Sequence, residues 1–184
     1  MTIARIGEFF QRLEGYTNRK TQLALQLLIL TLTRSGELRH GQWIEIIDKD
    51  WHIPAERMKM KRPHIVPLSD WALEILAEMR SLNKYGSPYF VTGNRNQPLS
   101  DMTLSKAMER LGYKGIAVPH GFRAMGSSVL NESGLWNPDA IERQLAHAES
   151  NAVRAAYNRA EYLDERRKML QWYSDFIHQK ISMK

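Results

Sequence analysis

Six polar residues, spread along the 184-residue chain, are of types that could act together on an anionic group. They are two arginines, a lysine, two histidines and a tyrosine: Arg34, Lys59, His120, Arg123, His147 and Tyr157. Guanidinium groups bind pairs of anionic oxygens and keep their charge, histidine moves protons near neutral pH, and tyrosine can be a nucleophile. His120 and Arg123 stand three positions apart, so one face of a helix would present both. Because the six are far apart in sequence, the fold has to bring them together.

Other catalytic motifs are missing from the sequence. It has no Cys, which excludes disulfides, thiolate zinc sites, iron–sulfur clusters and cysteine nucleophiles. It has no GxSxG, HExxH, P-loop or dinucleotide-binding motif. No two of its histidines have the i,i+4 spacing of a helical metal site: His40, His52, His64, His120, His147 and His178. We therefore expect no bound metal and no other cofactor.

The spacing of apolar residues predicts a mainly helical chain. An amphipathic helix is expected from Ile3 to about Gly15, and a nearly all-apolar helix from about Asn18 to Thr33 should lie at the centre of the core. Ser69 can cap one later helix, and Gly134 can end another. The later helices are expected over residues 69–82, 100–111, 119–132, 137–147, 153–157 and 162–179.

A small antiparallel sheet is expected between the second and third helices. Residues 43–47, 51–54 and 64–67 are typical of strands, and residues 48–50 of a turn. The last hairpin carries four basic residues and no acidic one between Glu56 and Asp70: Arg57, Lys59, Lys61 and Arg62. The expected fold class is α+β, mainly helical with a three-stranded antiparallel sheet, in one domain over residues 1–184.

Composition favours a globular protein with an anionic partner. The chain has 26 Lys and Arg against 20 Asp and Glu, a formal charge of +6, and 43% hydrophobic residues. This moderate basic excess points to nucleic acid. The chain shows no export signal and no run of the roughly 20 apolar residues that a membrane helix needs. We therefore expect a cytoplasmic protein without a membrane partner.

Four segments resemble, in the same order, the sequence boxes of the tyrosine recombinases (phage integrases). The amino-acid sequences of these boxes are most similar to those of integrases from prophages and genomic islands. The resemblance extends from about Thr21 to Arg167. Each box alone is weakly specific, whereas four in this order are strongly so. The boxes are the arginine box that ends Thr-Arg-Ser-Gly-Glu-Leu-Arg at Arg39, the lysine-bearing hairpin over 57–69, the HxxR box over 119–123, and the nucleophile box, Leu145 to His147 with Ala155 to Tyr157.

The resemblance implies a catalytic fold for breaking and rejoining DNA without metal or ATP. Arg34 and Arg123 would grip the non-bridging phosphate oxygens in the transition state. Tyr157 would attack phosphorus, giving a 3′-phosphotyrosine and a free 5′-hydroxyl. The phosphotyrosine keeps the energy of the broken bond, so the 5′-hydroxyl of another strand could reseal the DNA. Tyr162 is the rival nucleophile, but Tyr157 fits the spacing after His147 better.

The other residues of the boxes take supporting roles by the same resemblance. Lys59 would protonate the leaving 5′-oxygen, with Lys61 as a close rival. His120 and His147 would bind phosphate oxygens or help to move the proton of the nucleophile. Glu37 would orient the cations. The remaining basic residues of the hairpin would contact DNA: Arg57, Lys61 and Arg62.

The resemblance also implies partners and a longer chain. Double-stranded DNA is the expected partner, together with further protomers in a tetrameric synapse on DNA, and a monomer is expected in the absence of DNA. The last helix would either pack on its own domain or dock onto a neighbouring protomer. Family members usually carry N-terminal core-binding and arm-binding domains, which are expected to be absent from residues 1–184. The chain is then either a fragment of a longer integrase or a reduced protein, and we favour the catalytic fragment of a bacterial integrase that integrates or excises a mobile element.

Two other functions compete with site-specific recombination. The first is a basic DNA-binding module without catalysis, from a decayed integrase. The second is nicking and sealing of the type IB topoisomerase kind. The complete set from Arg34 to Tyr157 argues against decay.

Overall fold

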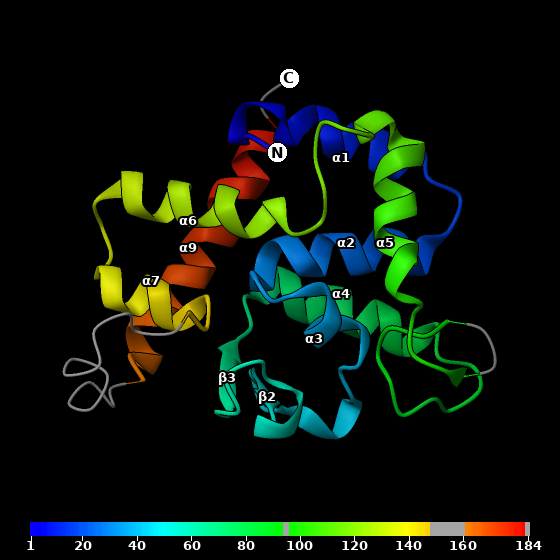
Figure 1. Cartoon of the computed structure of the whole chain (residues 1–184), viewed down its shortest axis with the longest axis horizontal. Coiled ribbons are helices and arrows are strands. Elements are labelled where there is room, and N and C mark those ends of the chain that lie inside the picture. The colour runs from blue at the N-terminus through cyan, green and yellow to red at the C-terminus, as the bar shows by residue number, and fades with distance from the viewer. Residues whose placement is uncertain (94–95, 148–160, 183–184) are drawn as a thin grey trace.

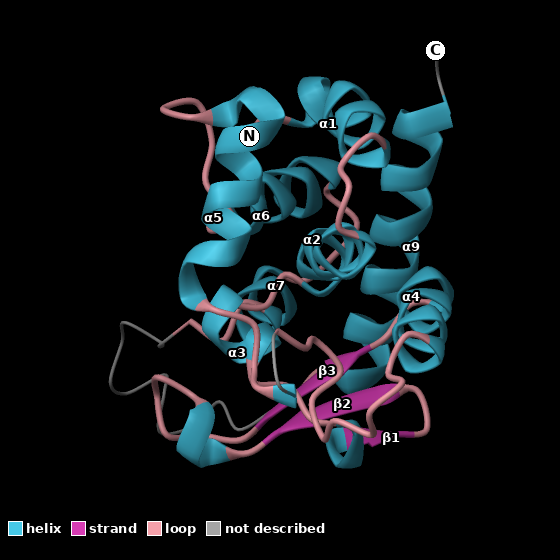
Figure 2. Ribbon diagram, turned by 90° about the vertical axis from the view of Figure 1, so that its right-hand side faces the viewer, coloured by secondary structure: helices cyan, strands magenta, loops and turns pink. Residues whose placement is uncertain are grey.

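A buried helix organises the molecule, which is described here by a computed structural model (Figure 1) over residues 1–93, 96–147 and 161–182. This helix, α2 (Arg19–Thr31), buries ten of its 13 residues, and the Asn18 side chain caps it by accepting a hydrogen bond from the Thr21 amide. Figure 2 shows α2 end-on in the middle of the other helices. It contacts α4 (Asp70–Ser81), α5 (Asp101–Met108), α6 (Gly121–Ser133) and α9 (Leu163–Ser182).

The two ends of the chain meet at one end of the molecule. A 3₁₀ turn (Ile3–Arg5) leads into α1 (Ile6–Glu14), and α1 packs against α9; both termini lie at the top of Figure 1. The apolar side of α9 is buried on its own chain through Met169, Leu170, Tyr173 and Ile177. The helix therefore packs on its own domain, one of the two expected arrangements; docking onto a neighbouring protomer stays a prediction.

The sheet confirms the expected antiparallel arrangement. Its strands β1 (Ile46–Ile47), β2 (Asp50–Ile53) and β3 (His64–Pro67) lie in that order. The register pairs Trp51 with Val66 and Ile53 with His64, which places these four side chains on the buried face. Strand β3 packs directly against helix α9.

The structure corrects several expected boundaries. Residues 43–45 form a 3₁₀ turn, not a strand, because the Glu45 carboxylate accepts hydrogen bonds from the Gln42 amide and the Trp51 indole, each at 3.0 Å. The expected helix over 100–111 is shorter, since α5 gives way to a π-helical turn at Glu109–Tyr113.

The helix expected over 137–147 also ends early. Helix α7 spans Pro138–Gln144, and Ala146 has a left-handed backbone (φ 47°), so His147 lies beyond the helix. A short helix not expected from sequence, α3 (Ser35–Arg39), follows α2. The helix expected over 153–157 lies outside the described residues. Among the residues that the structure describes, no helix is long and apolar enough to cross a membrane.

Candidate active site

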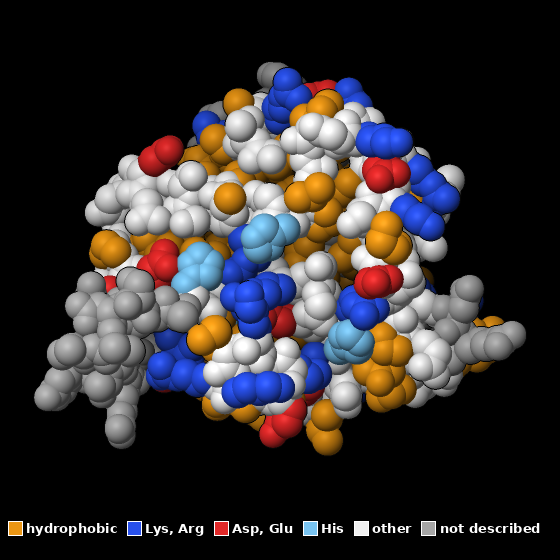
Figure 3. Space-filling model, in the orientation of Figure 1, with side chains coloured by type: hydrophobic (Ala, Val, Ile, Leu, Met, Phe, Trp, Pro, Cys, Tyr) orange, Lys and Arg blue, Asp and Glu red, His pale blue; other side chains and the backbone are white. Residues whose placement is uncertain are grey.

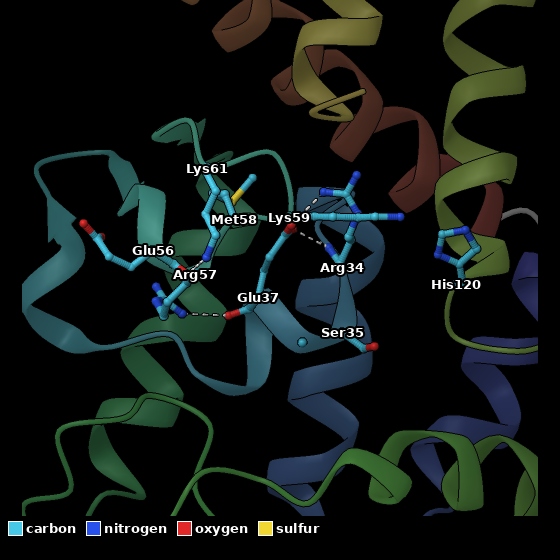
Figure 4. A pocket seen from close by; sticks show the side chains of 10 residues that line it. Arg34, Ser35, Glu37, Glu56, Arg57, Met58, Lys59, Lys61 and His120 are labelled. Atoms are coloured by element: carbon cyan, nitrogen blue, oxygen red, sulfur yellow. Dashed lines mark hydrogen bonds and ion pairs between the residues drawn. The ribbon is translucent and has the colours of Figure 1, made fainter. Parts of the chain in front are cut away.

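An open, cationic pocket lies where α3, the loop before β3 and the start of α6 meet (Figure 4). Its volume is about 540 Å³. Figure 3 shows Lys, Arg and His side chains gathered near the middle of this face of the molecule. The residues that line it are Arg34, Ser35, Gly36, Glu37, Glu56, Arg57, Met58, Lys59, Lys61 and His120. The pocket thus joins three of the four sequence boxes.

Glu37 fixes the position of Arg34. Arg34 is the N-cap of α3, and its guanidinium donates to Glu37 Oε1 at 2.8 Å while its backbone amide donates to Oε2 at 2.7 Å. Arg57 donates a hydrogen bond to the backbone carbonyl of Glu37 at 3.1 Å, which holds the backbone of Glu37 in place. The Glu37 side chain is only 4% exposed and that of Arg34 is 24% exposed, so Arg34 is held at its base and stays open to a ligand.

Arg123 is the more deeply buried arginine. It projects from the first turn of α6 and is 4% exposed. Its two terminal nitrogens donate to the carbonyls of Leu32 and Leu145. Burial, followed by the charge of Arg34, lowers the pKa of Arg123 to about 10, which leaves it protonated at neutral pH. Its Nε is buried and has no hydrogen-bond partner among the described residues.

The end of α7 brings the two arginines together. A helix leaves its last carbonyls without partners inside the helix. Here the Gln144 carbonyl bonds His64 Nε2 at 3.1 Å, the Leu145 carbonyl accepts from Arg123 at 2.5 Å, and the Ala146 carbonyl accepts from Arg34 at 3.2 Å. Arg34 and Arg123 are therefore held on neighbouring peptide groups, directly before His147.

The two histidines flank these arginines. His120 is the exposed N-cap of α6 and lines the pocket. His147 has its Nδ1 at 2.7 Å from Glu142 Oε2, with 46% of its side chain exposed. The carboxylate fixes the orientation of this ring, as a histidine that handles a proton requires.

The two candidate lysines differ in their partners. Lys61 donates to the Glu56 carbonyl at 3.2 Å. Lys59 has no hydrogen bond or ion pair with the described residues, and Figure 4 shows its side chain alongside Arg34, pointing to the side of the pocket where His120 lies. Lys59 is therefore the lysine that is free to approach a ligand.

The other basic residues of the hairpin are tied to the protein. Arg57 forms an ion pair with Glu45 in addition to its bond to the Glu37 carbonyl. Arg62 forms a half-exposed pair with Glu161 at 3.0 Å. Their expected contacts with DNA stay predictions. Tyr157, the expected nucleophile, lies outside the described residues, while its rival Tyr162 directly precedes α9 with a left-handed backbone (φ 49°).

Sequence reasoning missed three buried polar residues that meet at the end of α7: His64, Gln144 and Arg166. Arg166 left a signal, because it occupies the apolar stripe of α9 together with Leu170, Tyr173 and Ile177, where a charge needs a reason. No sequence pattern marked His64 or Gln144, because their importance depends on contacts between segments that are distant in the sequence.

Arg34, Lys59 and His120 line one pocket. Arg123 does not line it, but it is bound to the carbonyl next to the one that holds Arg34. Together these groups form a candidate site for an anionic group of the kind that phosphoryl transfer requires. Within the described ranges, no three side chains of metal-binding type gather together. Comparison with known proteins then gives the family. Residues 3–163 match the phage integrase family, and the chain belongs to it.

The relatives include prophage integrases, as the sequence boxes indicated. Prophage integrase IntZ of Escherichia coli K12 is 44% identical over 177 residues, which cover 95% of this chain and 44% of that protein. The integrase of enterobacteria phage P4 is 42% identical over 193 residues, covering 95% of this chain and 44% of that protein. The chain thus spans less than half the length of these relatives.

Solved structures confirm the expected fold. The lambda integrase catalytic core is similar with a TM-score of 0.64 and 21% identity, over 83% of this chain and 93% of that one. A lambda integrase tetramer bound to a Holliday junction is similar with a TM-score of 0.65 and 20% identity, over 88% of this chain and 48% of that one.

Proposed function

We propose that this chain is the catalytic part of a site-specific DNA recombinase, an integrase that cleaves and rejoins DNA through a 3′-phosphotyrosine. One observation carries the proposal: Arg34 and Arg123, from separate boxes, are held on the adjacent carbonyls of Ala146 and Leu145, beside an open pocket. Two fixed guanidinium groups can neutralise the charge that develops on a phosphate during attack. Membership of the phage integrase family supports the same reaction.

In the proposed reaction, the Tyr157 oxygen attacks the DNA phosphorus while the bond to the 5′-oxygen breaks. The leaving 5′-oxygen takes a proton from Lys59, and the tyrosine proton passes to a histidine or to solvent. The products are a 3′-phosphotyrosine and a free 5′-hydroxyl. Attack by the 5′-hydroxyl of a second strand reverses these steps and exchanges the strands.

The structure supports Lys59 over Lys61 as the general acid. Lys59 has no partner in the described part of the chain and lies alongside Arg34, whereas Lys61 is bonded to the Glu56 carbonyl. A general acid has to approach the leaving oxygen, which a free and extended side chain can do.

The partners follow from the same proposal. We infer double-stranded DNA as substrate and a tetramer of protomers as the reacting assembly, since a related fold forms a tetramer on a Holliday junction. We also infer that the natural protein is longer and carries separate DNA-binding domains, because the relatives are more than twice as long, and that it acts in the bacterial cytoplasm.

Covalent trapping tests this proposal. The chain is incubated at low salt with duplexes that carry a nick and a randomised sequence, so that the cut fragment diffuses away, and adducts are resolved on denaturing gels. The wild type and Tyr162→Phe should give an adduct, and Tyr157→Phe should give none. If the wild type gives no adduct, the result favours the inactive DNA-binding module. If Tyr162→Phe loses the adduct and Tyr157→Phe keeps it, Tyr162 is the nucleophile in place of Tyr157. Relaxation of supercoiled DNA without strand exchange would favour the topoisomerase-like alternative.

A further inference from the structure

Arg166 is a charged side chain in the middle of the core. It lies in the first turn of α9 and has no exposed surface. Burial, followed by repulsion from Arg143, lowers its pKa to about 9. A buried charge is costly unless its donors are satisfied, so the partners of this arginine indicate its role.

The Arg166 guanidinium joins three separate segments. Its Nε and one terminal nitrogen both donate to Gln144 Oε1, at 3.0 and 2.7 Å. The same terminal nitrogen donates to the Ile65 carbonyl in β3, and the other donates to the Glu161 carbonyl at 3.2 Å. Arg166 thus ties α9 to the hairpin and to the last residue of α7.

Gln144 passes this constraint to the active site. Its side chain is fully buried, with Oε1 held by Arg166 and Nε2 donating to the Thr31 carbonyl at 2.9 Å. Its own carbonyl bonds His64. The next two carbonyls, of Leu145 and Ala146, hold Arg123 and Arg34. The orientation of the Gln144 peptide therefore sets the direction of the carbonyls to which both catalytic arginines are bound.

We propose that Arg166 and Gln144 are positioning residues for Arg34 and Arg123: the buried bond between them fixes the end of α7, and with it the geometry of the two phosphate-binding guanidinium groups. The pair also joins the two sides of the stretch that contains Tyr157, since Gln144 precedes that residue and Arg166 follows it. The catalytic consequence rests on the function proposed above, whereas the geometric consequence does not.

The alternative is that Arg166 only anchors α9 and contributes to stability. Two changes separate these roles. Arg166→Lys keeps a positive charge, but one ammonium cannot reproduce the planar, forked contact with Gln144 and Ile65. Gln144→Leu removes the acceptor and keeps the approximate volume. Two controls test α9 without touching this contact: Arg167→Gln breaks the neighbouring pair with Asp50, which spans 2.9 and 3.0 Å, and Ile177→Ala removes buried apolar volume farther along α9.

Two readouts test the proposal. The first is NMR of the labelled arginine side chains, which follows hydrogen exchange of the Arg123 guanidinium without any substrate. The second is the rate of adduct formation per folded molecule, measured below the melting temperature, together with DNA affinity. Arg166→Lys and Gln144→Leu should each speed exchange at Arg123 and slow adduct formation by about tenfold or more, with DNA affinity changed less than about threefold. Arg167→Gln and Ile177→Ala should change neither rate.

Unchanged exchange at Arg123 in both variants, or the same change in Ile177→Ala, would overturn the proposal and leave Arg166 a structural anchor. If Arg166→Lys does not fold, Gln144→Leu decides the question. If the wild type forms no adduct, the proposed function fails, and the exchange measurement still decides whether the pair positions Arg123.

Discussion

Glu37 is the carboxylate that holds Arg34 in place, and it shows how a single buried acid sets the geometry of a cationic site. Both of its oxygens are used, one by the Arg34 guanidinium and one by the Arg34 amide. The sequence indicated a supporting role for this residue, but the two-point contact and the additional bond from Arg57 to its carbonyl depend on the folded hairpin.

Removing the charge of Glu37 should loosen Arg34. Glu37→Gln keeps the shape but loses a charge-assisted bond, so we expect adduct formation to fall by about tenfold or more and the protein to lose about 1–3 kcal/mol of stability. The adduct rate and denaturant unfolding measure the two effects. Glu8→Gln is the matched control, because Glu8 pairs with Arg12 on an exposed helix surface, where loss of the pair should cost less than about 1 kcal/mol. Equal behaviour of the two variants would contradict this role.

His64 should make the fold sensitive to acid. Burial, followed by the charges of Arg166 and Arg143, keeps the pKa of His64 well below its usual range, so the folded protein holds it neutral. Below about pH 6.5 the unfolded chain binds a proton that the folded chain does not. The contribution of neutral His64 to the free energy of unfolding is therefore fully present above that pH. It is lost as the pH drops towards the pKa of His64 in the folded protein.

The measurement is the melting temperature between pH 8 and pH 5. His64→Gln should reduce the loss on acidification, because the residue can still bond the Gln144 carbonyl but cannot take up a proton. His52→Gln, on the opposite face of the same sheet, should keep the wild-type pH dependence. The same slope in His64→Gln and the wild type would show that other groups cause the acid sensitivity.

At the scale of elements, the close approach of α6 to the end of α2 places Arg123. Leu32 ends α2 with a left-handed backbone (φ 54°), which turns its carbonyl to Arg123. Gly126, one turn after Arg123, leaves room for the Leu32 side chain, which a Cβ at this position would overlap. A residue with a left-handed backbone and a glycine at the meeting point of two helices thus hold Arg123 in place.

Gly126→Ala should therefore disturb both packing and chemistry. Overpacking a core of this kind costs about 1–3 kcal/mol, and displacement of Leu32 should move the acceptor of Arg123 and lower the rate of adduct formation. Denaturant unfolding and the adduct assay give the two values. Gly121→Ala is the control, since its Cβ would meet only the Met1 nitrogen at 3.5 Å. A fully stable and active Gly126→Ala protein would contradict this packing argument.

The elements also show what sequence can predict here. Helices α2 and α4 and strand β3 followed from local signals, namely the spacing of apolar residues and the cap at Ser69. The turn at residues 43–45 and the early end of α7 did not, because the first depends on Glu45 contacting Trp51 and the second on carbonyls that bind Arg34 and Arg123. Family resemblance gave the candidate residue types, while the Gln144–Arg166 contact between distant helices could not be read from sequence.

At the scale of the whole molecule, the net charge of +6 matters through its location. Arg34, Lys59 and Lys61 line one pocket, and basic and histidine side chains gather on the same face (Figure 3). Several acidic residues elsewhere are engaged in ion pairs, such as Glu78 with Arg19 and Asp50 with Arg167. Part of the excess charge is therefore presented at the candidate site.

This distribution predicts weak DNA binding with a strong dependence on salt. Phosphate contacts release counterions, and each contact contributes about −0.9 to the slope of log K against log salt. Fluorescence anisotropy on unrelated duplexes should show little sequence preference, because base readout requires specifically placed side chains. Lys61→Gln should reduce the slope by about 0.9, and Lys180→Gln, at the far end of α9, should leave it unchanged. Tight binding of one site at physiological salt would contradict this prediction.

The central claim, that Tyr157 becomes linked to DNA at a site built by Arg34 and Arg123, has one direct test. The trapped adduct is digested with nuclease and protease, and the modified peptide is sequenced by mass spectrometry. We predict a single modified residue, Tyr157, carrying a nucleotide through its 3′-phosphate. A nucleotide on Tyr162 or on a serine, a 5′-phosphate linkage, or the absence of any modified peptide would contradict the account.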